Sequence, residues 1–145
     1  MTEFVIPAQP VTSIPVKSGG AFPVRRVYCI WRNYAVHAIE MGHDPDREAP
    51  FFFQKNPNNL DASGEFPYTP HTSDVNHEAE LTVVLKSGGT NIPVESAMYH
   101  VYGYALSLDM TRRDRQGEIK KAGRPWEIGK AFERFAPIGP IHTVA

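Results

Sequence analysis

The chain has 145 residues, a length that fits one domain with a substantial buried core. Its 15 lysines and arginines oppose 16 aspartates and glutamates, and the resulting net charge of -1 argues against nucleic acid or an anionic membrane as a partner. A single cysteine, the absence of a secretory signal in MTEFVIPAQP and the lack of a long apolar run together predict a cytoplasmic protein that acts on a small molecule.

The first twenty residues are interrupted by Pro7, Pro10 and Pro15 and end in a Gly-Gly pair. Proline cannot continue a helix and donates no backbone hydrogen bond to a sheet. We therefore expect residues 1–20 to form an arm and a connector and residues 21–145 to form the catalytic domain.

Two strands and a short helix are predicted in the next part of the chain. Residues 24–31 are rich in β-branched and aromatic side chains, which favours a strand. A helix capped by Asn33 and ended by Gly42 follows. The three phenylalanines within residues 50–55 indicate a second strand, buried on both faces.

His37 and Glu40 stand three positions apart in the predicted helix, so their side chains share one face. The carboxylate can orient the imidazole and stabilise its charged form, which prepares a base that activates water. A histidine beside alanine and isoleucine is also common as a purely structural residue, and both interpretations stay open at this point.

Polar and apolar residues alternate from Glu78 to Leu85, as in a strand with one face toward a core. The carboxylates of Glu78 and Glu80 then point the same way and repel each other unless a proton or a cation lies between them. Magnesium, manganese and calcium prefer carboxylate oxygens, and Asp109 is the candidate third ligand. The alternative is an ordinary solvated face.

The rest of the chain is predicted to contain helical turns at residues 93–100 and a strand at 101–109. A charged loop at 111–124 and an apolar segment around Trp126 follow. Lys130 ends that apolar segment, where partial burial can hold its ammonium against a substrate carboxylate or a developing oxyanion.

Five segments occur in the order and spacing typical of the fumarylacetoacetate hydrolase family: RNYAVHAIEMG, FFFQK, NHEAELTVVL, YGYALSLDMTRRDRQ and WEIGKAFERFAPIGP. The resemblance covers roughly residues 24–145, and FVIPAQPVTSIPV is similar to its fumarylpyruvate hydrolase branch. It implies a β-rich α+β fold, a mixed β-sheet roll with short helices. The family's domain continues through further strands, so the resemblance also implies a roll that is truncated at its C-terminal side.

The same resemblance implies a set of site residues. The ligands of a catalytic Mg²⁺ or Mn²⁺ would be Glu78, Glu80 and Asp109, and the catalytic residues would be His37, Glu40 and Lys130. Candidates to hold the carboxylate of a dioxo acid are Arg112, Arg113 and Gln116, although a solvated loop charge is equally consistent with each arginine. Lys55 adjoins these motifs but is assigned an ordinary packing role.

The expected reaction is hydrolysis of a carbon–carbon bond in a 2,4-dioxo acid such as fumarylpyruvate, in aromatic-acid catabolism. Glu40 would orient His37, His37 would take a proton from water, and the hydroxide would attack the distal ketone while Lys130 stabilises the oxyanion. Pyruvate and fumarate would be released.

Three alternatives remain: an acylpyruvase or oxaloacetate decarboxylase, an isomerase of unsaturated dioxo acids, and a noncatalytic truncated homologue. A roll cut midway exposes strand edges, so we expect a homodimer. Trp31 departs from the family pattern, which has a small glycine there, and an indole at this position would reshape the pocket.

Overall fold

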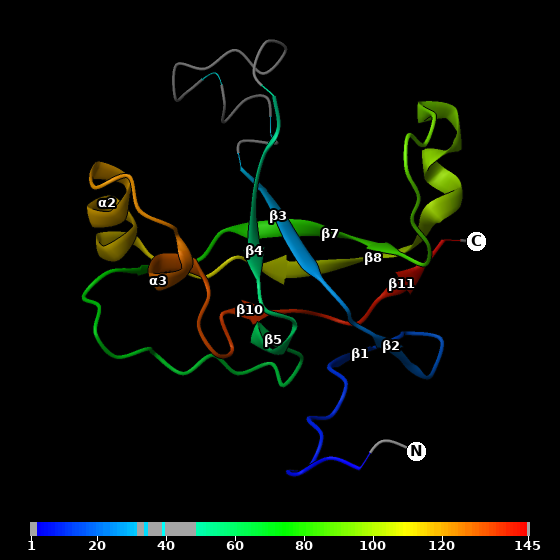
Figure 1. Cartoon of the computed structure of the whole chain (residues 1–145), viewed down its shortest axis with the longest axis horizontal. Coiled ribbons are helices and arrows are strands. Elements are labelled where there is room, and N and C mark those ends of the chain that lie inside the picture. The colour runs from blue at the N-terminus through cyan, green and yellow to red at the C-terminus, as the bar shows by residue number, and fades with distance from the viewer. Residues whose placement is uncertain (1–2, 32–33, 35–38, 40–48, 145) are drawn as a thin grey trace.

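A three-stranded antiparallel sheet crosses the middle of the molecule (Figure 1). The computed structural model describes residues 3–31, 34, 39 and 49–144. The sheet has the strand order β11-β8-β7, with β7 at Ala79–Leu85, β8 at Val101–Leu108 and β11 at His142–Thr143. The strands predicted at residues 78–85 and 101–109 are thereby confirmed.

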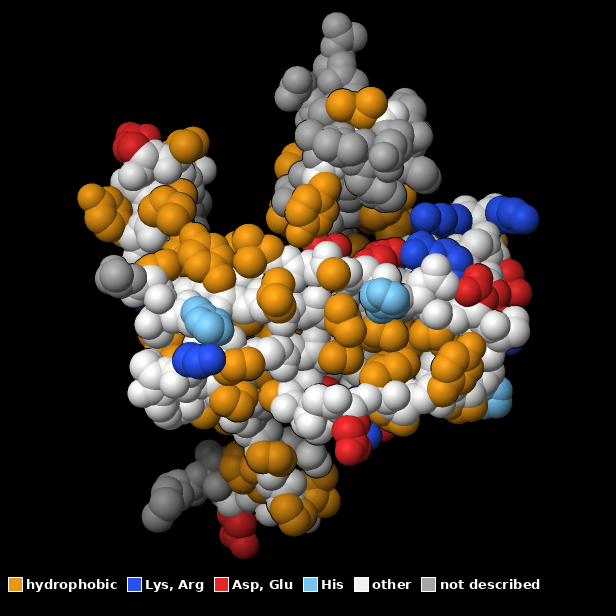
Figure 2. All heavy atoms as spheres, turned by 180° about the vertical axis from the view of Figure 1, so that it is seen from behind, with side chains coloured by type: hydrophobic (Ala, Val, Ile, Leu, Met, Phe, Trp, Pro, Cys, Tyr) orange, Lys and Arg blue, Asp and Glu red, His pale blue; other side chains and the backbone are white. Residues whose placement is uncertain are grey.

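The two faces of β7 differ in burial as the alternating sequence predicts. Thr82 and Val84 point toward the interior, where the Thr82 and Ser107 hydroxyls lie 2.7 Å apart across the β7·β8 pair. Leu81 and Val83 point outward and are 56% and 49% exposed. This outward face carries hydrophobic side chains across the back of the molecule (Figure 2).

A two-stranded ribbon of β3 (Val27–Trp31) and β4 (Phe51–Lys55) crosses the central sheet (Figure 1). Both strands were predicted, but the expectation that the phenylalanine strand is buried on both faces is wrong. Phe51 and Phe52 are 46% and 55% exposed. Within the described residues β4 pairs with β3 alone, and a two-stranded ribbon has too few neighbours to cover both of its faces.

The hydrophobic core lies between the central sheet and an N-terminal hairpin of β1 (Ser13–Pro15) and β2 (Ala21–Pro23). Its buried members are Ile14, Val16, Val84, Ala105, Ile138 and Ile141. The inner end of the expected arm therefore packs as part of the fold. Pro15 lacks an N–H group, but its carbonyl accepts a hydrogen bond from the Ile141 N–H at 2.9 Å, so proline does not prevent this packing.

Short elements connect these parts. The 3₁₀ helices are η1 (Pro57–Asn59) and η2 (Val94–His100), and the latter agrees with the helical turns expected there. The remaining short strands form two pairs, β5 (Leu60–Asp61) with β10 (Ala136–Pro137) and β6 (Val75–Asn76) with β9 (Thr111–Arg112).

The expected charged loop at 111–124 is wrong, because most of it forms helix α2 (Arg113–Lys121). Asp114 lies in its first turn and Lys120 near its end, where each charge complements the helix dipole. The short helix α3 (Glu127–Lys130) follows and packs against α2. Within the described ranges, no helix has the length and apolar character that a membrane crossing requires.

Candidate active site

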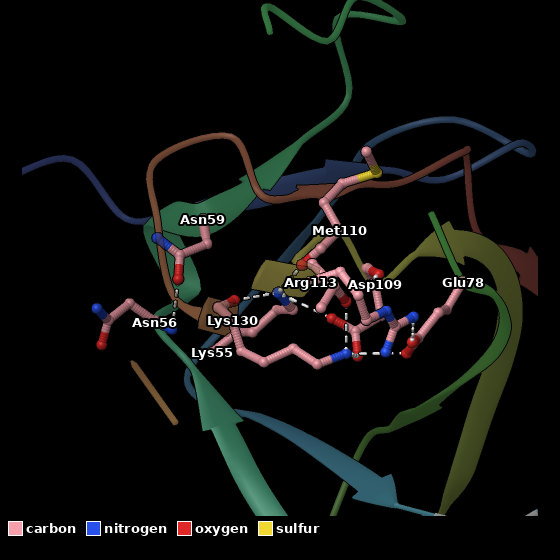
Figure 3. A network of polar contacts seen from close by, with 9 residues as sticks. Lys55, Asn56, Asn59, Glu78, Asp109, Met110, Arg113 and Lys130 are labelled. Atoms are coloured by element: carbon pink, nitrogen blue, oxygen red, sulfur yellow. Dashed lines mark hydrogen bonds and ion pairs between the residues drawn. The ribbon is translucent and has the colours of Figure 1, made fainter. Parts of the chain in front are cut away.

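The ammonium of Lys130 is the centre of a buried polar network (Figure 3). Lys130 ends α3 and is 2% exposed. Its Nζ donates hydrogen bonds to Asp109 Oδ2 at 2.7 Å, Glu78 Oε2 at 2.8 Å and Thr111 Oγ1 at 2.7 Å. Two acids that are far apart in the sequence therefore meet at one positive charge.

Asp109 follows β8 and is 7% exposed. Its backbone N–H donates to the Glu78 carbonyl at 2.8 Å, which fixes the end of β8 beside the start of β7. The Asp109 Oδ1 atom lies 2.9 Å from Lys55 Nζ, but this ion pair does not have hydrogen-bond geometry. Among the described residues, Oδ1 has no hydrogen-bond partner, so it keeps an acceptor for a further cation or donor.

Lys55 is the residue of this network that sequence reasoning missed. It is 3% exposed and donates to the Met110 carbonyl at 3.3 Å and to the Lys130 carbonyl. Burial lowers the pKa of Lys55, and the nearby Asp109 carboxylate opposes that effect. The pattern FFFQK contained a signal for this position, because a lysine in step with Phe51 and Phe53 points to the same face of a strand.

Glu78 has a second cationic partner on its outer side. Arg113 forms an ion pair with Glu78 Oε1 and donates to Gln116 Oε1 at 2.8 Å. Burial alone would raise the pKa of Glu78, but the Lys130 ammonium and the Arg113 guanidinium outweigh it and hold this pKa below its usual value. The structure thus brings Arg113 and Gln116 to the carboxylates.

Glu80 lies one pleat further along β7, on the same side as the other acids. Burial raises the pKa of Glu80, and the negative charges of Asp109 and Glu78 raise it further, while a hydrogen bond with Tyr34 lowers it. The Tyr34 hydroxyl also accepts a hydrogen bond from the Leu81 N–H at 3.3 Å. The ionised form of Glu80 therefore has less compensating positive charge near it than Glu78 has.

Among the described residues that were predicted for the site, Arg112 does not join the carboxylates. Arg112 is 4% exposed, stacks over the Phe132 ring at 3.2 Å and donates to Thr69, so its guanidinium contacts neither Glu78 nor Asp109. The predicted pair of His37 and Glu40, with the helix expected to carry it, lies outside the described residues.

The carboxylates of Glu78, Glu80 and Asp109 are chemically suited to a hard divalent cation, because carboxylate oxygens are the ligands that Mg²⁺ and Mn²⁺ prefer. Glu78 and Asp109 already converge on a cation, the Lys130 ammonium, and Glu80 lies beside them. As they are placed here, no three of the described acids, histidines or cysteines form a metal-binding cluster.

Comparisons of the sequence and of the structure with known proteins indicate the same family. A family model described as fumarylacetoacetate (FAA) hydrolase C-terminal matches residues 26–145. The solved fumarylpyruvate hydrolase of Pseudomonas aeruginosa, in complex with Mn²⁺ and pyruvate, is 48% identical with a TM-score of 0.90. That alignment covers 97% of this chain and 63% of the other.

Curated relatives carry different activities in their names. The mitochondrial oxaloacetate decarboxylase of Dictyostelium discoideum is 40% identical over 79% of this chain and 53% of its own length. A mitochondrial oxaloacetate tautomerase of Caenorhabditis elegans is 38% identical over 83% of this chain and 56% of its own length. The chain thus spans about half the length of these relatives.

Proposed function

The chain belongs to the fumarylacetoacetate hydrolase family, and from that premise we propose that it is a metal-dependent hydrolase of a 2,4-dioxo acid such as fumarylpyruvate, releasing fumarate and pyruvate in aromatic-acid catabolism. The observation that carries this proposal is the convergence of Glu78 and Asp109 on one buried positive charge beside Glu80. The solved relative that contains Mn²⁺ and pyruvate supports both the metal and the product.

In this proposal Glu78, Glu80 and Asp109 hold the divalent ion, Mg²⁺ or Mn²⁺. An ion held there would supply Lewis-acid chemistry to the ketone oxygens of the substrate. Lys55 forms an ion pair with Asp109 at the other carboxylate oxygen, since its ammonium lies 2.9 Å from Oδ1.

Lys130 and Arg113 supply the positive charge that the substrate meets. Lys130 is 2% exposed and donates to Asp109, Glu78 and Thr111, and in this proposal a developing oxyanion replaces one of these three acceptors. Arg113 is held by Glu78 and by Gln116 at the partly exposed rim, and its planar guanidinium suits the carboxylate end of a dioxo acid.

We assign the proton transfer to His37 and the orientation of its ring to Glu40, on the basis of their spacing and of the family pattern. His37→Ala is therefore expected to lower kcat strongly while Mn²⁺ binding stays unchanged, which titration calorimetry and initial rates would separate. A loss of Mn²⁺ binding in this variant would contradict the assignment.

A second candidate activity is tautomerisation or decarboxylation of oxaloacetate, favoured by the names of the curated relatives. All these reactions pass through an enol or enolate beside a carboxylate, so the same acids and ammonium serve each of them. The three differ in product: hydrolysis of fumarylpyruvate gives fumarate, decarboxylation releases carbon dioxide, and tautomerisation only changes the ultraviolet absorbance of the substrate.

The decisive experiment assays the full chain with fumarylpyruvate, acetylpyruvate and oxaloacetate. Each substrate is tested with Mn²⁺, with Mg²⁺ and after exhaustive chelation, and pyruvate, carbon dioxide and enol absorbance are followed in parallel. We expect metal-dependent release of fumarate and pyruvate from fumarylpyruvate. Unchanged rates after chelation, or metal binding without turnover of any of the three substrates, would overturn the proposal.

We also propose a cytoplasmic location and a homodimer. The outward face of β7·β8 exposes Leu81, Val83, Leu85 and Leu106, and no charged side chain lies between them in the strand pairing. Exposed apolar surface of this kind is typical of protein interfaces, and an uncharged face suits a second copy of itself. Sedimentation equilibrium is expected to give twice the chain mass, and Leu81→Glu is expected to lower it.

A further inference from the structure

A cavity of about 280 Å³ lies beside the candidate site, between β4 and the turn that joins α2 to α3. Its lining includes the aromatic side chains of Phe51, Phe53 and Trp126. Its polar lining comes from Gln54, Arg124 and Glu127. Within the described structure, none of these three polar side chains hydrogen-bonds with Lys130, Glu78 or Asp109.

The cavity and the Lys130 network lie along one face of β4. Phe51, Phe53 and Lys55 alternate on that strand, and two residues advance about 6.6 Å along it. Lys55 contacts Asp109, while the Phe53 ring centroid lies 5.4 Å from Lys130 Nζ and 5.6 Å from the Trp126 ring. A molecule held at Lys130 therefore reaches the cavity by extending along β4, past Phe53.

Three aromatic rings line this space, and a fourth packs against them. The Trp126 ring lies 5.3 Å from Phe51 and 5.1 Å from Trp31, with the two indoles nearly perpendicular at 82°. Trp31 thus packs its indole against the rings that line the cavity. Flat conjugated groups stack well on such rings, whereas short flexible groups gain little from them.

Arg124 gives the cavity a carboxylate partner. Arg124 is exposed and lies between Gly123 and Pro125. Gly123 has a φ of 61°, in the left-handed region that glycine adopts readily. A planar guanidinium binds a carboxylate through paired hydrogen bonds. Glu127 lines the same space and repels an anion, so Arg124 is the residue of this lining that attracts a carboxylate.

We propose that this cavity binds the distal part of an acyl substrate, a flat conjugated chain that ends in a carboxylate. Phe51, Phe53 and Trp126 stack on the chain and Arg124 binds the terminal carboxylate. The inference rests on the proposed function and deepens it, because it names the feature by which this site would distinguish fumarylpyruvate from the shorter acetylpyruvate and oxaloacetate.

Tryptophan fluorescence tests the cavity without any turnover. The chain has 2 tryptophans, and both belong to this aromatic cluster. A Trp31→Phe background leaves Trp126 as the only reporter and keeps an aromatic ring at position 31. Fumarate is expected to quench Trp126 in a saturable manner, and pyruvate is not.

Arg124→Met in the same background is expected to raise the Kd of fumarate by about ten-fold, because a charge-assisted contact is lost. The matched control is Lys121→Met, which removes one exposed positive charge from the end of α2 without touching the cavity. The proposal is overturned if fumarate produces no change in fluorescence, or if Arg124→Met binds fumarate as tightly as the Lys121→Met control.

Steady-state kinetics with Mn²⁺ separate this inference from the proposed function. Arg124→Met is expected to raise KM about ten-fold for fumarylpyruvate and to leave KM for acetylpyruvate unchanged. Equal effects on both substrates would overturn the cavity assignment while the hydrolase activity stands. Fumarate binding that depends on Arg124, in a protein that turns over no dioxo acid, would support the cavity and refute the hydrolase.

Discussion

Lys130 Nζ lies 2.7 Å from Asp109 Oδ2, although the two residues are 21 positions apart and belong to different elements. The same ammonium binds Glu78, so one buried cation compensates two carboxylates. Charges this deeply buried are stable only when they are paired and hydrogen-bonded. The relationship explains how two carboxylates are held close together in the fold, and it leads to the first two predictions.

Lys130→Met is expected to destabilise the metal-free chain by about 3–5 kcal/mol, because it leaves the Asp109 carboxylate buried with one cation fewer. Added Mn²⁺ is expected to raise the Tm of this variant more than that of the unsubstituted protein, since the ion restores the missing charge. Thermal unfolding with and without Mn²⁺ measures both effects. Equal Tm gains in the two proteins would contradict the idea that the ion compensates for the lost ammonium.

Glu80→Gln and Glu78→Gln form a matched pair with opposite effects on the metal-free chain. Burial and neighbouring negative charges raise the pKa of Glu80, so removing its charge is expected to leave the free energy of unfolding at pH 7 unchanged or slightly higher. Glu78 is stabilised as an anion by Lys130 and Arg113, so its amide variant is expected to be less stable. Both variants are expected to bind Mn²⁺ at least about ten-fold more weakly.

Chemical denaturation and calorimetry on the same samples provide both measurements. A Glu80→Gln variant that binds Mn²⁺ as tightly as the unsubstituted chain would remove Glu80 from the ligand set.

Asp114 predicts a pH dependence of stability at acid pH. Hydrogen bonds from the Thr72 hydroxyl and the Ser73 N–H lower the pKa of Asp114 from its ordinary value of 3.8 to about 2. The unfolded chain takes up this proton first as the pH falls, so the contribution is complete above the ordinary value and disappears as the pH falls through the folded one.

The stability advantage of the unsubstituted chain over Asp114→Asn is therefore expected to shrink between pH 5 and pH 2, as measured by urea denaturation. A difference that does not change with pH over this range would show that Asp114 makes no such contribution. Asp61, whose pKa is also lowered, remains intact in both proteins and its effect cancels in the comparison.

Two glycines provide a contrasting pair of alanine substitutions. A Cβ on Gly103 would collide with the His142 carbonyl where β11 pairs with β8, so Gly103→Ala is expected to cost about 1–3 kcal/mol of stability. Gly117 lies within α2 with open space around the added methyl, so Gly117→Ala is expected to stabilise the chain by up to ~1 kcal/mol. Urea denaturation measures the free energy of unfolding of both variants. An unchanged value for Gly103→Ala would contradict the close approach of β8 and β11 at this position.

The sequence predicted the fold correctly where the local repeat of polar and apolar residues decides the structure. Alternation placed Thr82 and Val84 on the inner face of β7 and Leu81 and Val83 on the outer face, because side chains of a strand point to opposite sides in turn. Helix α2 was missed because its charged sequence has no apolar stripe. Its Gln116 and Ile119 are nevertheless buried, and packing against the rest of the fold supports the helix.

The sequence by itself determined which acids and cations are available and that Glu80 shares a face with its β7 neighbours. Only the tertiary structure decided that Lys55 joins Asp109 while Arg113, rather than Arg112, reaches Glu78. The physical reason is the distance along the chain over which each feature is decided. The two-residue period of a strand is fixed locally by the backbone. The approach of β4, β8 and α3 depends on how segments distant in the sequence pack together, and no local sequence pattern predicts it.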